Sequence, residues 1–191
     1  MTERGILFSA AMVRALLDGT KTQTRRVVNV KNPDWIRRHV HPYKSDNNNG
    51  KVVYGWDGNA GDVLTCPYGQ PGDRLWVRET WAPHPDFPET THRGVYRADP
   101  ECKYDVARWR PSIHMPRWAS RILLEITGVR VERLQDISEA DAVAEGISQH
   151  YAEGRRVSCR VAYAWLWESI NGAGSWDANS WVWVVEFRRI A

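Results

Sequence analysis

The sequence is poor in several residue types, and each shortage excludes a class of protein. Its 191 residues include only 3 cysteines, Cys66, Cys102 and Cys159, which are far apart and form no CxxC pair. This odd, scattered set indicates neither a disulfide framework nor a structural zinc site. The histidines likewise lack a helical metal-ligand spacing. We therefore expect no metal, no other cofactor and a reducing cytoplasm.

Long uncharged apolar runs are also lacking, so the sequence predicts no membrane span, and the first residues are too polar for a signal peptide. A surplus of one charge sign is lacking too, since the net charge is only +3 and the pI about 8.8. This mild excess permits contact with a polyanion such as RNA but is far below that of a dedicated nucleic-acid coat protein.

Phenylalanine is scarce at 3 residues, whereas tryptophan is abundant at 11. Indole rings bury a large area, keep one N–H donor and stack well on bases, so this bias suits a dense core or an aromatic pocket. Core packing is the default for any single tryptophan. A chain of this length is expected to form one domain.

The N-terminal third predicts a strand at 6–8, then a helix at 10–18 capped by Ser9 and ended by Gly19. The chain is expected to be extended over 22–30. The stretch 31–61 is polar and rich in Asn and Gly, which predicts a surface insertion with at most a small hairpin around 51–56.

The middle of the chain predicts two long strands. Residues 74–81 alternate so that Leu75, Val77, Glu79 and Trp81 share one face, which places a carboxylate among apolar residues. Residues 122–131 also alternate, and Gly128 shifts the parity as a β-bulge does.

The C-terminal part predicts two helices and a central strand. A capping box at 138–141 opens a helix that Gly146 ends, and residues 159–170 predict a helix with Val161, Trp165 and Ile170 facing inward. The apolar run at 181–190 predicts a central strand. Several bent strands with few helices favour an α+β barrel over a doubly wound sheet.

Four stretches together resemble ASCH-domain proteins of the PUA-like superfamily, of the kind found in phages and prophages. They are GTKTQTRR at 19–26, GDRLWVRETW at 72–81, PSIHMPRWASR at 111–121, and SING at 169–172 with WVW at 181–183. The resemblance implies a bent β-barrel with a few peripheral helices, as one domain over 1–191 with surface insertions at about 31–61 and 82–108. It also implies a cytoplasmic protein, in a bacterial host cell if the chain is phage-derived.

One branch of this family consists of small amidohydrolases that cleave N4-acetylcytidine. The residues that match its motif here are Lys21, Thr24 and Glu79. The resemblance therefore implies Thr24 as nucleophile, Lys21 as its activator and Glu79 as acid and base. This chain is larger than those minimal domains and carries extra loops, a difference that bears on the substrate more than on the chemistry.

Considered on their own, these residues permit the same interpretation and a simpler one. Lys21 and Thr24 would face opposite sides of a regular strand, so they converge only if the chain bends near Gly19. A buried Glu79 needs a proton or a cation, and Lys21 is the expected partner. The simpler alternative is an ordinary ion pair that closes the barrel, with Thr24 as a strand residue.

Further basic and aromatic residues are candidates for binding a nucleoside or nucleotide, although a solvated basic face or simple packing is the plainer explanation of each. They are Arg25, Arg26, Arg78, Trp81, His114, Arg117 and Arg121. The predicted function is hydrolysis of an N4-acylated cytidine or a related modified pyrimidine nucleoside. The alternative is a non-catalytic module that binds RNA or a modified nucleobase in the same pocket.

Overall fold

The computed structural model describes residues 1–29, 41–43, 51–56, 59–87, 91, 93–148, 150–152 and 155–191. The described strands are β1 Glu3–Leu7, β2 Gln23–Val27, β3 His41–Tyr43, β4 Lys51–Trp56, β5 Asn59–Thr65, β6 Arg74–Arg78, β7 Trp81–Pro83, β8 Gly94–Tyr96, β9 Leu123–Arg133, β10 His150–Ala152, β11 Arg155–Val157 and β12 Trp181–Arg189. The helices are α1 Ala10–Leu17, α3 Glu139–Ala144 and α4 Cys159–Asn171, with short 3-10 turns at η2 Ser112–His114, η3 Arg117–Ala119 and η4 Leu134–Asp136.

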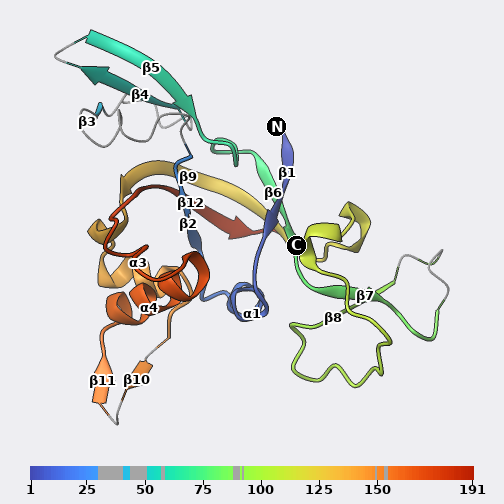
Figure 1. Cartoon of the computed structure of the whole chain (residues 1–191). Helices are drawn as coiled ribbons and strands as arrows, with labels where there is room; N and C mark the ends of the chain where they lie inside the picture. Colours follow the sequence, from blue (N-terminus) through green and yellow to red (C-terminus); the bar gives the residue numbers. More distant parts are fainter. Residues whose placement is uncertain are drawn as a thin grey trace.

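Five strands form the central sheet in the order β1-β6-β9-β12-β2 (Figure 1). Strand β1 is parallel to β6, and the other neighbours are antiparallel. The register of β9 on β12 shifts where Gly128 lies opposite Glu186 and Ile126 lies opposite Phe187. The predicted bulge at Gly128 and the central position of the last strand are both confirmed.

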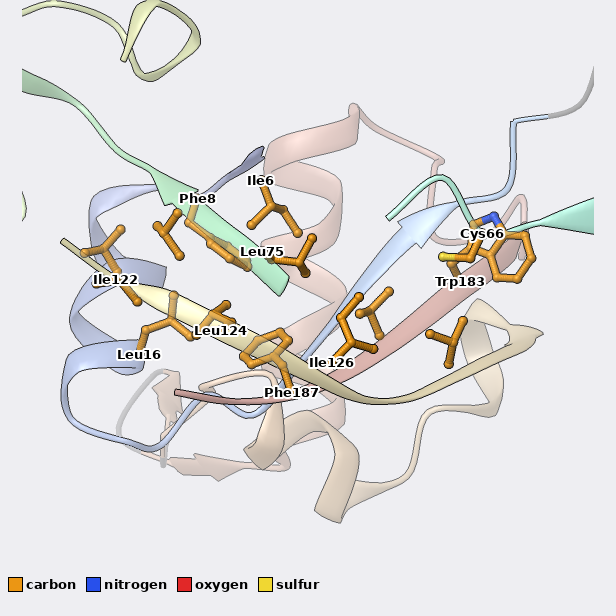
Figure 2. Packing of buried hydrophobic residues seen from close by; sticks show 14 of the residues in the cluster. Ile6, Phe8, Leu16, Cys66, Leu75, Ile122, Leu124, Ile126, Trp183 and Phe187 are labelled. Carbon is orange, nitrogen blue, oxygen red and sulfur yellow. The ribbon is translucent and has the colours of Figure 1, made fainter. Parts of the chain in front are cut away.

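Each face of this sheet packs against helices. Alternate residues of β12, Trp183, Val185 and Phe187, belong to a first core that includes residues of α1 (Figure 2). Val182 and Val184, which alternate with these residues along β12, belong to a second core with residues of α3 and α4. We call these the α1 face and the α3/α4 face.

The two edge strands come together around the first core. Arg26 of β2 donates from Nη2 to the carbonyl oxygen of Leu7 in β1 at 2.8 Å, and its Cζ lies 5.3 Å from the centre of the Phe8 ring. A flat sheet of five strands would keep its edges far apart, so the sheet must curve strongly. The expected mixed α+β fold, with a bent, sheet-dominated core and few helices, is confirmed.

The predicted inward face of α4 is wrong. Val161, Trp165 and Ile170 are 41%, 45% and 57% exposed, whereas Tyr163 and Trp167 are buried against the α3/α4 face of the sheet. Apolar residues occur on several sides of this helix, so its periodicity does not select one face. Among the described residues, no helix is long and apolar enough to cross a membrane.

The expected insertions contain more structure than predicted. Strand β4 is the middle strand of a three-stranded sheet with β3 and β5, which projects away from the central sheet (Figure 1), so the limit of one small hairpin was wrong. Residues 30–40, 44–50 and 57–58 lie outside the described part. The segment 82–108, expected to be the second insertion, contains most of the β7–β8 hairpin and of the loop that leads to η2.

Candidate functional site

Lys21 occupies the tight connection between α1 and β2. Ser9 caps the start of α1, and after the helix Gly19 has a φ of +73°, in the left-handed region that glycine adopts without strain. The backbone N–H of Lys21 then bonds to the carbonyl of Ala15 at 3.0 Å. This turn directs the lysine side chain into the protein, where the residue is only 2% exposed.

The partner of Lys21 is Glu145. Lys21 Nζ donates to the backbone oxygen of Glu145 at 2.8 Å and to its Oε2 at 2.7 Å. Next to it, Gly146 has a φ of +89°, and a Cβ there would lie 3.2 Å from the Cβ of Lys21. Burial lowers the pKa of Lys21, and the Glu145 carboxylate offsets part of that effect.

Thr24 lies on the α1 face, since its partner across the β2–β12 ladder is Val185 of the first core. It is 1% exposed, and its Oγ1 has no hydrogen-bond partner among the described residues. Lys21 Nζ therefore does not hydrogen-bond to this hydroxyl in the described structure. A buried hydroxyl without a partner costs free energy. The packing around Thr24 and the pairing of β2 with β12 must offset this cost.

Glu79 follows β6 on the side of Leu75 and Val77, and it is 1% exposed. Its carboxylate accepts two hydrogen bonds from Arg121, from Nε to Oε1 at 2.9 Å and from Nη2 to Oε2 at 3.1 Å. Nη2 of Arg121 also contacts Asp99 Oδ1 at 2.7 Å. Burial raises the pKa of Glu79, and Arg121 opposes this increase.

The predicted ion pair between Lys21 and Glu79 is therefore wrong. The planar guanidinium of Arg121 matches the two carboxylate oxygens of Glu79, which a single ammonium group cannot do. Lys21 is held by Glu145 instead, a residue that the sequence interpretation missed. The position of Glu145 directly before the glycine that ends α3 was the only local signal for it.

Phe8 links the neighbourhoods of Lys21 and Glu79. Its ring centre lies 5.6 Å from Lys21 Nζ, and its backbone N–H donates to the carbonyl oxygen of Arg78 at 3.1 Å. Phe8 thus contacts Lys21 through its ring and the end of β6 through its backbone, within the first core that also contains the neighbour of Thr24 across the ladder. Among the described residues, Lys21 and Thr24 border this core, whereas no hydrogen bond or ion pair joins Glu79 to either of them.

Arg25 lies on the opposite, α3/α4 face of the sheet, where its side chain is fully buried. It contacts Glu132 Oε1, Glu145 Oε1 at 3.1 Å and Asp141 Oδ2 at 3.6 Å. Neighbouring Arg130 contacts Glu132 and Asp141 as well. Arg25 was a candidate for binding a nucleoside or nucleotide, but the structure places it inside this ion network, because three carboxylates surround its guanidinium.

The other predicted binding residues lie in separate places. Arg78 and Arg117 both lie over the ring of Trp76 on the outer side of β6, at 5.3 Å and 5.9 Å from Cζ to ring centre. Trp81 is 1% exposed and packs edge-on against Trp118, so it is a core residue. As described above, Arg26 spans the two edge strands.

Two hollows are lined mainly by residues of the segment 82–108. The first, the Arg121 hollow, has a volume of about 620 Å³ and is lined by His84, Gly94, Val95, Tyr96, Asp99, Pro100, Glu101, Cys102, Tyr104 and Arg121. The second, the Arg108 hollow, has the same volume and is lined by Pro83, His84, Pro85, Phe87, Asp105, Val106, Ala107, Arg108, Arg110, Pro111 and His114. His84 lines both hollows. Of the residues predicted to bind a ligand, Arg121 lines the Arg121 hollow and His114 lines the Arg108 hollow.

Within the described residues, no group of three or more His, Cys, Asp or Glu side chains is arranged to hold a metal ion. Charged residues that the sequence interpretation missed are Asp99, which supports Arg121, and Glu132, which holds Arg25. Both partners lie far away in sequence, so no local pattern identifies them.

Comparison with known proteins found no matching family model and no matching curated protein. Among solved structures, the chain is similar to the crystal structure of an ASCH domain from Lactobacillus crispatus JV V101. The two are 11% identical in sequence, the match covers 98% of this chain and 79% of that chain, and the TM-score is 0.45. At this level the likeness carries no argument about activity.

Proposed function

We propose that this protein is an amidohydrolase of the ASCH type that cleaves the amide of an N4-acylated cytidine or a related modified pyrimidine nucleoside. The observation that carries the proposal is the buried Thr24 hydroxyl, which has no hydrogen-bond partner within the described part of the chain and lies three residues from a buried lysine whose pKa is lowered. The residue matches with the ASCH amidohydrolases, Lys21, Thr24 and Glu79, supply the expected roles.

The contacts of Lys21 are compatible with the neutral amine that a general base requires. A neutral amine has two N–H donors and one lone pair, and two hydrogen bonds from Nζ to Glu145 are described. Neutral Lys21 can therefore keep both bonds and still have its lone pair available for the proton of the Thr24 hydroxyl. Contacts that complete a catalytic site often form only when substrate is bound.

Glu79 has the properties of a carboxyl group that can hold a proton. Burial raises its pKa, which favours the protonated form, while Arg121 fixes the orientation of the carboxyl plane. Protonated Glu79 can donate its proton to the leaving nitrogen. Arg121 is thereby a positioning residue, because it acts through Glu79.

The proposed reaction proceeds in two steps. The Thr24 oxygen attacks the amide carbonyl while its proton passes to Lys21, and the C–N bond then breaks as the exocyclic amine takes a proton from Glu79. Water next hydrolyses the acyl ester on Thr24 and restores both proton carriers. The products are the free cytidine and a carboxylic acid.

The ion pair between Lys21 and Glu145 favours a second candidate. A lysine that keeps its proton is a poor base but a good hydrogen-bond donor to a ligand carbonyl, so the same residues would suit a non-catalytic module that binds a modified nucleobase or RNA.

The two candidates are separated by incubating the purified protein with a panel of N4-acylated cytidines and following the release of cytidine by chromatography. Turnover of at least one member that is lost in Glu79→Gln supports the hydrolase. Binding of the panel without turnover, weakened by Lys21→Ala, supports the binding module. Unimpaired hydrolysis by Glu79→Gln would remove the role proposed for Glu79.

A further inference from the structure

The two hollows beside the second insertion differ in charge. Among the described residues, the Arg108 hollow is lined by Arg108, Arg110, two histidines and one carboxylate, that of Asp105. The described lining of the Arg121 hollow contains the rings of Tyr96 and Tyr104, two carboxylates and Arg121, which pairs with Glu79 and Asp99. One hollow therefore suits an anion, and the other suits an uncharged aromatic group with hydroxyl or amine donors.

His84 stands where the hollows meet, and its orientation is fixed. Its Nδ1 accepts a hydrogen bond from the backbone N–H of Asp86 at 3.2 Å, so the neutral ring carries its proton on Nε2. The ring packs edge-on against Phe87 at 4.8 Å and against Tyr104 at 4.5 Å between ring centres. His84 can thus present an N–H donor to a ligand that extends from one hollow into the other.

The walls of both hollows are anchored to the rest of the protein. The backbones of Arg110 and Trp81 exchange two hydrogen bonds, at 2.8 Å and 3.2 Å, and the Arg110 guanidinium lies 5.3 Å from the Trp81 ring centre. In the other hollow, Arg121 stacks on Tyr96 at 4.0 Å and clamps Glu79. A ligand in the Arg121 hollow would therefore lie beside Arg121, which holds the carboxyl group of Glu79, the proposed proton donor.

We propose that the two hollows form one nucleotide site, in which the Arg121 hollow takes the nucleoside and the Arg108 hollow takes a phosphate group attached to it. The nucleoside half rests on the proposed function, whereas the phosphate half rests on the positive charge of Arg108 and on the N–H donor of His84. The natural substrate is then a phosphorylated nucleoside, and Arg108 is the residue that recognises the phosphate.

The test is isothermal titration of the full chain with cytidine, cytidine 3′-monophosphate, cytidine 5′-monophosphate and inorganic phosphate at one fixed ionic strength. We expect one of the two monophosphates to bind about tenfold more tightly than cytidine, because a guanidinium–phosphate contact is a charge-assisted pair. Arg108→Ala should remove most of this preference and leave cytidine binding unchanged.

Arg97→Ala is the matched control, since Arg97 is exposed in the same segment and lines neither hollow. It should leave the preference for the monophosphate intact. Tyr104→Ala, at a residue that is 45% exposed, should weaken cytidine binding while inorganic phosphate binding stays unchanged.

Three results would overturn the inference: equal affinity for cytidine and both monophosphates, no binding of any of them, or equal losses in Arg108→Ala and Arg97→Ala. Its failure is distinguishable from failure of the proposed function. A protein that prefers a monophosphate in an Arg108-dependent way but hydrolyses no acylated cytidine keeps the phosphate site and loses the hydrolase. A protein that hydrolyses the amide without this preference keeps the hydrolase alone.

Discussion

Glu145→Gln is the substitution that tests the electrostatics of the site most sharply. The Lys21 side chain is 0% exposed and that of Glu145 is 3% exposed, so water cannot replace the lost carboxylate. Arg25 retains Glu132 and Asp141 as partners, whereas Lys21 loses the only charged group described in contact with it. In the variant, folding should therefore require Lys21 to give up its proton.

The expected magnitude follows from the proton equilibrium. An unfolded lysine has a pKa near 10.4, so holding Lys21 neutral at pH 7 costs up to roughly 4–5 kcal/mol, at about 1.4 kcal/mol per pH unit. The unfolded variant binds one proton more than the folded variant, so its stability should increase with pH and approach that of the wild type near pH 10. In the wild type, burial already lowers the pKa of Lys21, which gives the same sign with a smaller effect because Glu145 opposes it.

The assay is urea unfolding followed by tryptophan fluorescence at pH 7 and pH 9. Glu145→Gln should gain about 2–3 kcal/mol relative to the wild type between these values. The double variant Lys21→Met/Glu145→Gln should recover stability at pH 7, since it has no proton to lose. Glu186→Gln is the control: this carboxylate pairs with Arg130 but is 45% exposed, so its loss should cost less than about 1 kcal/mol at either pH. A cost for Glu145→Gln that is small and independent of pH would refute the reasoning.

Two further pairs of variants test the packing, each by the shift in the urea midpoint. Gly146→Ala should lower the free energy of unfolding by about 1–3 kcal/mol, because the position has a positive φ and the new Cβ would lie 2.9 Å from a side-chain carbon of α1. Gly128→Ala should lower it less, because its Cβ would lie 2.7 Å from the movable end of the Glu186 side chain. Trp167→Ala should lower the free energy of unfolding by roughly 3–5 kcal/mol, because it leaves a cavity in the second core. Trp165→Ala, at a residue that is 45% exposed, should lower it by less than about half of that amount. Equal costs within either pair would show that the packing is misassigned.

Local signals in the sequence predicted local structure correctly. Ser9 caps α1, the capping box at Ser138 opens α3, and Gly128 marks the shift in register between β9 and β12. In each case the cause lies within a few residues of its effect, because a cap or a bulge is made by neighbouring backbone groups.

Features that depend on distant residues were not predictable in the same way. The partners Lys21 and Glu145 are 124 residues apart, and Glu79 and Arg121 are 42 apart, so only the folded chain shows which charge meets which. The buried side of α4 is likewise chosen by β12, since apolar residues occur on several sides of the helix.

For the candidate catalytic residues too, the sequence indicated which residues are buried but not which partners they contact. Their identity came from a short motif and from a carboxylate among apolar residues, and both Lys21 and Glu79 are indeed buried. Their ion-pair partners, Glu145 and Arg121, could not be predicted from that pattern, because the fold determines which opposite charge lies next to a buried charge.

The central claim is that Thr24 and Lys21 act as one unit on an acylated cytidine, and the most direct measurement is the turnover of N4-acetylcytidine by wild type, Thr24→Ala, Lys21→Ala and the double variant. If the claim is correct, each single substitution lowers kcat by about 10²- to 10⁴-fold, and the double variant is scarcely slower than either single variant. Losses of only two- or three-fold, or losses that multiply in the double variant, would contradict it.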